Sequence, residues 1–400
     1  MKSIKYLESI ESKGIKMGLE RTKKLALECG NPHKKLPIIQ VVGTNGKGSI
    51  SAILSNIFKN SGYNTGLFTS PHLVNLNERI RINGLPILNS EIKIFLEKYK
   101  ISINKIDSSF FEVMTIMAFW YFNKKKVDIA IMETGLGGRL DSVSICNPKI
   151  LVFSPISYDH IEILGPSLKK ITIEKTGAIK NKTLCVSSPQ KKIVKNIMIK
   201  EAFKKNAPLV FVNNKNLKKF NIGILGNVQQ ANAAVALKVI KLLKNYNISD
   251  NSINSALKNL IWYGRNQIIS KKPLIIFDVA HNHDAILNFL KFYNEFEVSG
   301  TRTLLIGLQN RKNINDNIKN LVSSFNHIII TQTFNKNSMD CKFLKSLFKN
   351  LINCTIIKDP EIAINKIYSK LNKNDSLVIL GSHYLGPAVS KIFKISFDAI

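Results

Sequence analysis

The sequence predicts an α/β fold of two domains, a large N-terminal phosphate-loop domain on a mostly parallel sheet and a smaller C-terminal α/β domain. The chain has 400 residues, which is more than one compact core usually organises. Short runs rich in β-branched residues alternate with longer helical patterns, as in βαβ units. A glycine-rich turn around one lysine follows the first of these runs, which indicates a loop that holds an anion.

Five short runs in the first half predict the parallel strands of the larger sheet. They are LPIIQVVG (36–43), YNTGLFTS (63–70), DIAIMET (128–134), KILVFSPI (149–156) and KTLCVSS (182–188). The helical patterns between them supply the crossovers that parallel strands need.

The loop at residues 43–49 reads GTNGKGS and lies between the first predicted strand and a helical run. Its glycines let backbone N–H groups converge on an anion, and the helix N-terminus adds the positive end of its dipole. Lys47 can bridge the β- and γ-phosphates of a nucleotide, and the Ser49 hydroxyl suits a nearby metal ion. Gly48 separates these two residues, which departs from the usual spacing. The flanking strand and helix favour nucleotide binding over a bare glycine-rich turn.

Three residues able to serve a cation each follow a predicted strand, namely Ser70, Glu133 and His160. The carboxyl ends of parallel strands meet at one edge of a sheet, so we expect these side chains beside the phosphate loop. Oxygen ligands suit Mg²⁺, whereas an imidazole on chemistry alone fits Zn²⁺ better. Taken singly, each has a structural explanation, such as an ion pair between Glu133 and Arg139. Their shared location favours a metal site.

A second series of short runs follows Pro273 and predicts the smaller domain. The runs are LIIFDVA, TRTLLIGL, HIIITQT, TIIK and DSLVILGS. Glycine and polar residues before Pro273 interrupt the periodic pattern, which indicates a junction. We therefore predict an N-terminal domain of residues 1–262, a linker of residues 263–272 and a C-terminal domain of residues 273–400.

The formal net charge of +31 by itself suggests a nucleic-acid partner. Most of the 58 basic residues are lysines scattered among Asn and Ile. Proteins that bind the bases and phosphates of nucleic acids favour clustered arginines instead. We interpret the charge as a compositional bias without nucleic-acid binding. A positive field still attracts small anionic substrates.

The cysteines and the hydropathy pattern predict a cytoplasmic protein. Five widely spaced cysteines without a C-x-x-C pair argue against a disulfide framework and a structural zinc site. No run approaches the roughly 18 uncharged apolar residues of a membrane span. The charged N-terminal segment lacks the apolar stretch of a secretion signal.

Seven motifs in this order resemble folylpolyglutamate synthase/dihydrofolate synthase, within the larger family of ATP-dependent Mur ligases. They are GTNGKGS, TSPHLVNLNERIRING, ETGLGGRLD, YDHIEILG, EKTGAI, FDVAHN and LGSHYL, and they extend from Gly43 to Leu385. The resemblance implies an ATP-binding central-type domain followed by a Rossmann-like glutamate-ligase domain, with ATP between them and a monomeric chain.

The resemblance also implies a role for individual residues. The ATP-binding residues would be Thr44, Asn45, Gly46, Lys47, Gly48, Ser49, Asn232, Arg265 and Asp278, with His281 and Asn282 in support. Two Mg²⁺ ions would be held by Ser70, Glu133 and His160. The pterin-bearing substrate would contact Gly18, Leu19, Ser109, Phe110 and Asp141, framed by the loop NERIRING. Lys175 matches a lysine that the family carbamylates, and burial favours the neutral amine that captures CO₂.

The implied reaction adds L-glutamate to dihydropteroate, or to a reduced folate and its glutamyl chain. A carboxylate attacks the γ-phosphate of ATP to give an acyl phosphate, and the glutamate amine then displaces phosphate. Lys47, Lys175 and His160 would serve this chemistry, with Lys47 and Mg²⁺ stabilising the transferring phosphoryl group. No covalent protein nucleophile is implied.

Three positions depart from the family pattern. Lys16 stands where many members have an acid, Val228 replaces a common histidine, and GLQNRKN (307–313) lacks the usual acidic end. These departures concern the dihydropteroate pocket and the amino-acid site more than ATP binding.

Two rival functions remain open to test. A Mur-type ligase acting on a nucleotide-linked muramoyl acid is disfavoured by NERIRING and by the GKG spacing. A GTP-dependent switch or nucleic-acid-dependent NTPase is suggested by the N-K-x-D pattern of residues 372–375, yet this pattern precedes its predicted strand instead of ending one. Substrate and base-specificity panels would distinguish them.

Overall fold

The computed structural model describes residues 2–12, 14–213, 219–310, 312, 314–349 and 351–400. The chain forms two compact units. The first comprises Met1–Gly223, Gln229–Leu260 and Asp398–Ile400, and the second comprises Ile224–Val228 and Ile261–Phe397. The chain therefore passes between the units four times, after residues 223, 228, 260 and 397.

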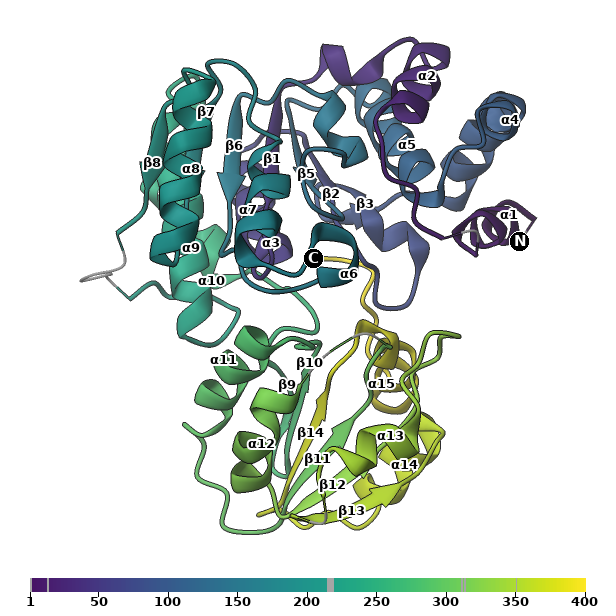
Figure 1. The fold of residues 1–400 in the computed structure, drawn as a ribbon, viewed down its shortest axis with the longest axis vertical. Helices are drawn as coiled ribbons and strands as arrows, with labels where there is room; N and C mark the ends of the chain where they lie inside the picture. The colour runs from purple at the N-terminus through teal and green to yellow at the C-terminus, as the bar shows by residue number, and fades with distance from the viewer. Residues whose placement is uncertain (1, 13, 214–218, 311, 313, 350) are drawn as a thin grey trace. The chain divides into compact units, whose positions relative to one another are not determined.

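The first unit is built on an eight-stranded sheet with the strand order β4-β3-β2-β5-β1-β6-β7-β8 (Figure 1). Neighbouring strands from β2 to β8 are parallel, whereas β3 pairs antiparallel with both β2 and β4. The strands are β1 (Ile38–Val42), β2 (Thr65–Phe68), β3 (Ile80–Ile82), β4 (Leu85–Pro86), β5 (Ile129–Glu133), β6 (Ile150–Phe153), β7 (Leu184–Ser187) and β8 (Leu209–Phe211). The predicted mostly parallel sheet is confirmed.

Helices cover both faces of this sheet. Side chains on alternate positions of β1, β5 and β6 pack under α5, α7 and α8, and α3 lies against β1, β2 and β5. The helices are α1 (Lys2–Glu11), α2 (Glu20–Glu28), α3 (Lys47–Asn60), α4 (Asn89–Ile106), α5 (Phe110–Lys124), α6 (Ile161–Leu164), α7 (Leu168–Thr176), α8 (Lys192–Lys204), α9 (Asn227–Leu242) and α10 (Asp250–Lys258). The 3₁₀ turns are η1 (Pro32–Lys35), η2 (Leu76–Arg79) and η3 (Ser142–Ile145).

The second unit is a six-stranded sheet with the order β13-β12-β11-β14-β10-β9 (Figure 1). All its pairs are parallel except β9 with β10. The strands are β9 (Gln267–Lys271), β10 (Leu274–Asp278), β11 (Arg302–Ile306), β12 (His327–Ile330), β13 (Asn353–Ile356) and β14 (Ser376–Leu380). The helices are α11 (His283–Tyr293), α12 (Ile318–Ser324), α13 (Cys341–Ser346), α14 (Pro360–Tyr368) and α15 (Gly386–Phe393), with 3₁₀ turns η4 (Asn315–Asn317) and η5 (His383–Leu385). The predicted smaller α/β domain is confirmed.

Two segments differ from the sequence analysis. The NERIRING segment, interpreted as a loop, contains η2, β3 and the start of the β3–β4 hairpin at the sheet edge. The segment 263–272, interpreted as a linker, contains β9, which pairs with β10 inside the second unit. β9 is an edge strand, whose polar residues hide the periodic pattern of a buried strand, and β3, next to the edge strand β4, is only three residues long.

The last three residues of the chain belong to the first unit. Asn75 Nδ2 donates to Asp398 Oδ1 at 3.0 Å, Ile400 N donates to Gly84 O at 3.2 Å, and Lys59 Nζ donates to Ile400 O at 3.1 Å. The hairpin that frames the predicted substrate pocket therefore rests on a segment more than three hundred positions later in the sequence.

Three further predictions can be checked on the fold. The five cysteines are all free. Among the described residues, no helix has the length and apolar character of a membrane span. The N-K-x-D pattern forms a turn, because the Asp375 carboxylate accepts from Asn372 N and Thr301 N at 2.7 Å each.

Candidate active site

The phosphate loop begins where β1 leaves the sheet. Thr44 N and Asn45 N donate to Pro155 O at 2.9 and 3.3 Å, so the loop stays attached to the segment that follows β6. Gly46 precedes α3 with φ of 86°, in the left-handed region. A Cβ atom there would lie 2.7 Å from Asn232 Oδ1, so this turn requires glycine both for its backbone and for the close approach of Asn232.

Lys47, Glu133 and Ser70 meet beside this loop. Lys47 Nζ lies 4.0 Å from Glu133 Oε1, and Ser70 N donates to Glu133 Oε2 at 3.1 Å. Glu133 is buried at the end of β5, and Ser70 follows β2. Residues from three strand ends therefore converge, as expected for ligands at the carboxyl edge of a parallel sheet.

Lys175 on α7 points at the same loop, since its Nζ donates to Gly43 O at 2.6 Å. The side chain is buried. Burial, and after it the nearby Lys47, lower the pKa of Lys175 to about 7, against the raising effect of Asp159 and Asp141. Near neutral pH a large fraction of this amine is therefore uncharged.

Asp141 is bonded to the backbone of its own segment. Its carboxylate accepts from Gly135 N, Leu136 N and Val143 N, each at 2.9 Å. Complete burial nevertheless raises the pKa of Asp141 to about 6, against the lowering effect of these bonds and of Lys47. The structure thus gives Asp141 a structural role in the ETGLGGRLD turn that the sequence analysis did not anticipate.

The oxygen atoms near the loop fit a magnesium ion better than a zinc ion. The Ser49 hydroxyl is buried without a hydrogen-bond partner in the described part of the chain, which leaves an oxygen ready for a ligand. No group of three or more His, Cys, Asp or Glu side chains able to hold a metal ion occurs among the described residues. A cation here would therefore draw on hydroxyl oxygens, the Glu133 carboxylate and water, which is the ligand set of Mg²⁺.

His160 lies at the start of α6 with φ of 50°. Its N–H donates to Asp159 Oδ1 at 2.9 Å, and its Nε2 lies 4.0 Å from the same oxygen. The imidazole is 39% exposed. The His160 carbonyl oxygen accepts from Ile163 N and Leu164 N at 3.0 and 2.9 Å, which begins the short helix α6.

The predicted pterin-binding residues gather around the start of α5. Ser109 caps α5, because its N donates to Glu112 Oε2 at 2.6 Å and its hydroxyl accepts from Glu112 N at 3.4 Å. Arg21 on α2 contacts Glu112 at 3.2 Å, which brings the preceding Gly18 and Leu19 toward this end of α5. The Arg79 guanidinium lies 5.0 Å from the centre of the Phe110 ring.

The sequence analysis missed a set of polar contacts in the loop before β3. Arg79 Nε donates to His72 Nδ1 at 2.9 Å, and burial together with Arg79 lowers the pKa of His72 to about 3. The Glu78 carboxylate accepts from Leu73 N, Val74 N and Asn75 N at 2.9, 2.8 and 2.6 Å. The histidine and the acid lie inside the motif TSPHLVNLNERIRING, so the motif itself was the available signal.

The predicted residues of the second unit cluster at the end of β10. The Asp278 carboxylate accepts from Asn266 N and Ala280 N at 2.7 Å each. Burial raises the pKa of Asp278, and Arg265 opposes this shift. His281 Nδ1 lies 2.9 Å from Val279 O.

The next two residues form the start of α11. Asn282 Oδ1 accepts from Ala285 N at 3.0 Å and caps the helix. His283 was not predicted to have a role, yet its Nδ1 contacts Asn317 Oδ1, and Asn317 Nδ2 donates to His283 O at 3.1 Å. Asn317 is fully buried, so this pair holds the first turn of α11 in place.

The positions that depart from the family pattern lie outside these clusters. Lys16 forms an ion pair with Asp107 and also donates to Asp107 O at 3.1 Å. Val228 is half-buried in the first turn of α9. In GLQNRKN, Arg311 and Asn313 lie outside the described residues.

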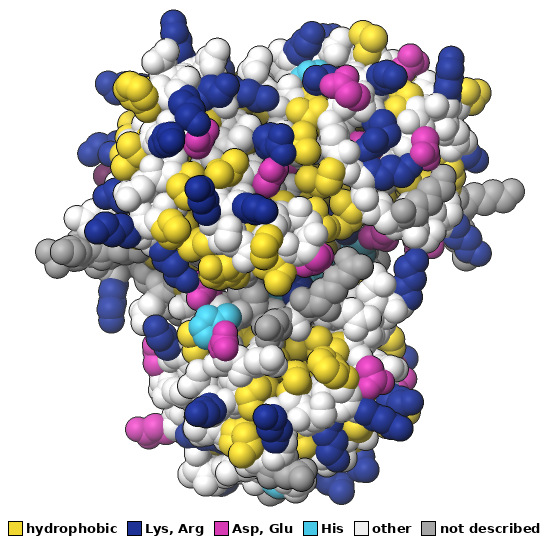
Figure 2. Space-filling view, in the orientation of Figure 1, with side chains coloured by type: hydrophobic (Ala, Val, Ile, Leu, Met, Phe, Trp, Pro, Cys, Tyr) yellow, Lys and Arg dark blue, Asp and Glu magenta, His cyan; other side chains and the backbone are white. Residues whose placement is uncertain are grey.

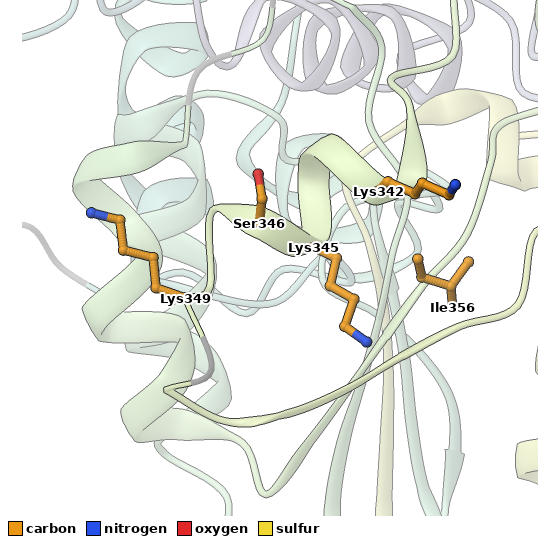
Figure 3. A pocket seen from close by; sticks show the side chains of 5 residues that line it. All are labelled: Lys342, Lys345, Ser346, Lys349 and Ile356. Carbon is orange, nitrogen blue, oxygen red and sulfur yellow. The ribbon is translucent and has the colours of Figure 1, made fainter.

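Two further features of the described part of the chain are its scattered surface charge and one cavity of the second unit. Figure 2 shows lysine and arginine side chains scattered over the visible face, in keeping with a compositional bias. A cavity of about 420 Å³ in the second unit is lined by Lys342, Lys345, Ser346, Lys349 and Ile356. Its lysine side chains point in different directions (Figure 3), and it contains none of the predicted site residues.

Comparisons with known proteins define the class of the chain. Residues 41–176 match the Mur ligase middle domain, and residues 264–383 match the Mur ligase glutamate ligase domain. The fold and the loop therefore define a Mur ligase.

Relatives then define the family. A Bacillus subtilis protein named dihydrofolate synthase/folylpolyglutamate synthase is 30% identical over 95% of this chain and 96% of its own length. An Escherichia coli protein of the same name is 32% identical over 78% of this chain and 76% of its own length. The chain belongs to the dihydrofolate synthase/folylpolyglutamate synthase family.

Solved structures agree with this assignment. E. coli FolC in complex with DHPP and ADP has a TM-score of 0.88 at 26% identity, covering 98% of this chain and 97% of that one. Folylpolyglutamate synthase from Thermotoga maritima has a TM-score of 0.84 at 29% identity over the same shares. Mycobacterium tuberculosis folylpolyglutamate synthase complexed with ADP, at 22% identity and a TM-score of 0.91 over 98% of this chain and 99% of that one, shares the fold.

Proposed function

We propose that this protein is an ATP-dependent ligase that adds L-glutamate to dihydropteroate, or to a reduced folate and its glutamyl chain, with release of ADP and phosphate. The observation that carries the proposal is the convergence of Lys47, Glu133 and Ser70 on a glycine-rich loop at the carboxyl edge of a parallel sheet. The names of the Bacillus subtilis and E. coli relatives and the ADP and DHPP of the FolC complex support it.

The phosphate loop holds the triphosphate of ATP in this proposal. Backbone N–H groups at the start of α3, together with the helix dipole, stabilise the phosphate charges. Lys47 contacts the γ-phosphate and stabilises the negative charge that develops as the phosphoryl group transfers. The other proposed nucleotide contacts are Thr44, Asn45, Gly46, Gly48, Ser49, Asn232, Arg265 and Asp278, with His281 and Asn282 in support.

The substrate carboxylate attacks the γ-phosphorus, the bond to the β-phosphate oxygen breaks, and ADP leaves with that electron pair. The acyl phosphate then reacts with the neutral amine of glutamate, which forms the amide, expels phosphate and releases a proton. Because no protein atom becomes covalently bound, the residues act by positioning and by electrostatic stabilisation. The proposed contacts of the pterin-bearing acid are Gly18, Leu19, Ser109, Phe110 and Asp141.

We propose that Ser70, Glu133 and His160 would hold two Mg²⁺ ions. A bound Mg²⁺ would supply positive charge against the phosphates and the γ-phosphorus. A carbamate on Lys175 would convert an amine beside Gly43 into an anion able to hold a cation. The pKa of Lys175, about 7, supports this modification because a neutral amine is required.

The proposed enzyme acts as a monomer in the cytoplasm, without nucleic acid or membrane. Its five free thiols suit a reducing compartment.

Purified protein with ATP, Mg²⁺ and glutamate tests the function. Dihydropteroate and a reduced folate are supplied separately, while ADP release and the mass of the new amide are followed. We expect glutamate-dependent ADP release with at least one acid. Activity with a muramoyl nucleotide alone, or a preference for GTP, would contradict the proposal.

A further inference from the structure

The phosphate loop depends on residues 154–157 for its position. Pro155 O accepts from both Thr44 N and Asn45 N. The Thr44 hydroxyl donates to Ser157 O at 3.2 Å and accepts from Ser157 N at 3.1 Å. A shift of this segment therefore moves the backbone that is proposed to bind phosphate.

Residues 154–157 and the phosphate loop are in close contact at Gly43. A Cβ atom on Gly43 would lie 1.9 Å from Ser154 Oγ, so the loop backbone packs directly on Ser154. Gly43 O also accepts from Lys175 Nζ. The position of Ser154 thus bears on both the loop and the buried amine.

The backbone hydrogen bonds of the sheet end near Ser154, at the start of this segment. The last sheet-like bonds near it are those of Ser154 N with Val42 O and of Ser188 N with Phe153 O, each 2.8 Å. Pro155 has no N–H to donate. On the side of β7, a side chain anchors the segment and supplies the described bonds to Ser154 O and Ile156 N.

Gln190, which follows β7, provides that anchor. Its Oε1 accepts from Ile156 N and its Nε2 donates to Ser154 O, both at 3.0 Å. Nε2 also lies 3.2 Å from Ser187 Oγ and 3.1 Å from Ser188 Oγ. The amide orientation is fixed because a backbone N–H only donates and a carbonyl only accepts.

We propose that Gln190 is a positioning residue for the nucleotide, which fixes residues 154–157 and through them the geometry in which the phosphate loop binds ATP. The proposal rests on the function proposed above. Gln190 acts through Pro155 and Ser157, and it is not a catalytic residue. Its loss allows the loop to move relative to the phosphates, so nucleotide binding weakens while the sites for the acid and for glutamate are retained.

The test compares Gln190→Leu with wild-type protein by calorimetric titration with ADP and with ATP, alongside steady-state kinetics. We expect both dissociation constants, and the KM for ATP, to rise about 5- to 30-fold, as for the loss of one to two hydrogen bonds. The KM values for the acid and for glutamate should change by less than about twofold. A merely structural role would not separate these parameters.

Gln230→Leu is the matched control. Gln230 also bonds one backbone segment through both amide atoms, accepting from Phe220 N at 2.7 Å and donating to Phe220 O at 3.0 Å. We expect it to leave ADP binding unchanged. Equal weakening by both variants would overturn the proposal, because it would indicate general loosening of the unit.

If Gln190→Leu does not fold, the Gln190→Glu variant tests whether Gln190 positions the phosphate loop. Glutamate keeps the acceptor for Ile156 N but places a carboxylate oxygen against Ser154 O. We expect at least about threefold weaker ADP binding. Wild-type affinity in a folded Gln190 variant overturns the inference. Wild-type protein that binds ADP yet ligates no glutamate overturns the proposed function instead, since the readout here is binding.

Discussion

At the scale of single residues, the site places two amines against one loop, and their surroundings differ. Lys47 retains 15% exposure of its side chain and faces the Glu133 carboxylate. Lys175 is buried and donates to a carbonyl oxygen. The surroundings of Lys47 suit a permanent cation that binds phosphate, whereas those of Lys175 suit an amine that loses its proton.

Replacing Lys47 by alanine should abolish most of the ligation. The variant loses the cation proposed to stabilise the transferring phosphoryl group, so we expect kcat/KM for ATP to fall by at least about 100-fold. Steady-state ADP release measures this. Lys23→Ala, which removes an exposed partner of Glu20, should behave like wild-type protein. Full activity in a folded Lys47→Ala protein would remove the basis of the proposed mechanism.

Carbamylation of Lys175 should increase with pH. The pKa of about 7 lies below the ordinary value of 10.5, so the amine is protonated and unreactive below pH 7 and becomes neutral above it. We expect the carbamate signal from ¹³C-labelled bicarbonate to grow between about pH 6 and pH 8. NMR of wild-type protein measures the signal.

Two variants assign this signal to one lysine. Lys175→Met should lose it. Lys180→Met should keep it, although half-burial also lowers the pKa of Lys180. A signal that is independent of pH, or that survives in Lys175→Met, would contradict the modification.

Gly46 and Gly62 have the same backbone conformation but different neighbours. Substituting each by alanine therefore separates the effect of a steric clash from the effect of backbone strain. Gly46 has φ of 86° and would place a Cβ 2.7 Å from Asn232 Oδ1, whereas Gly62 has φ of 85° and open space. Gly62→Ala should cost about 1 kcal/mol of stability without loss of nucleotide binding. Gly46→Ala should cost the same strain and in addition weaken ADP binding by at least about tenfold, because the loop or the Asn232 side chain, both proposed nucleotide contacts, must move. Equal ADP affinities for the two variants would contradict this geometry.

At the scale of elements, the start of α5 combines a helix cap with an ion pair. Glu112 accepts from Ser109 N and pairs with Arg21 while almost fully buried. Glu112→Ala removes both interactions and leaves a buried donor unpaired, so the free energy of unfolding should fall by about 2 to 4 kcal/mol. Urea denaturation measures this loss.

Glu20→Ala is the comparison for that measurement. Glu20 pairs with Lys23 on the surface, and such pairs contribute less than about 1 kcal/mol. A similar loss in both variants would mean that burial does not strengthen the cap of α5.

The predictable elements were those whose burial leaves a pattern in the sequence. The strands β1, β5, β6, β10 and β14 are buried at every position and largely apolar, and each was predicted. The edge strands β4, β8 and β9 and the three-residue strand β3 beside β4 were missed, because half-exposed or very short strands leave little periodic pattern in the sequence. Gln267–Lys271 was therefore interpreted as a linker.

The site was predictable where it depends on strand ends. Ser70 and Glu133 follow β2 and β5, so their approach to Lys47 follows from sheet topology alone. The contacts of His72 with Arg79, and of Gln190 with Ser154, depend on the path of loops that no periodicity describes. Asn232, on a helix distant in sequence, was placed at the loop only through the family resemblance.

At the scale of the whole molecule, the net charge of +31 works against the compact state through self-repulsion. Added salt screens this repulsion, because the Debye length falls from about 14 Å to about 6 Å between roughly 0.05 and 0.3 M salt. We therefore expect Tm to rise with NaCl over this range. Calorimetry measures it, and equal osmolarity of glycerol controls for solute effects. A Tm that falls with salt would indicate that attractive pairs dominate the surface.

The return of Asp398–Ile400 to the first unit makes the second unit an insertion within it. During synthesis the ribosome must therefore complete residues 261–397 before the first unit can acquire its final three positions. The hairpin at Gly84 and the end of α3 at Lys59 can form their bonds with Ile400 only after the second unit has been synthesised. The nascent first unit thus matures only after the inserted unit has been made, which orders the assembly of the enzyme in time.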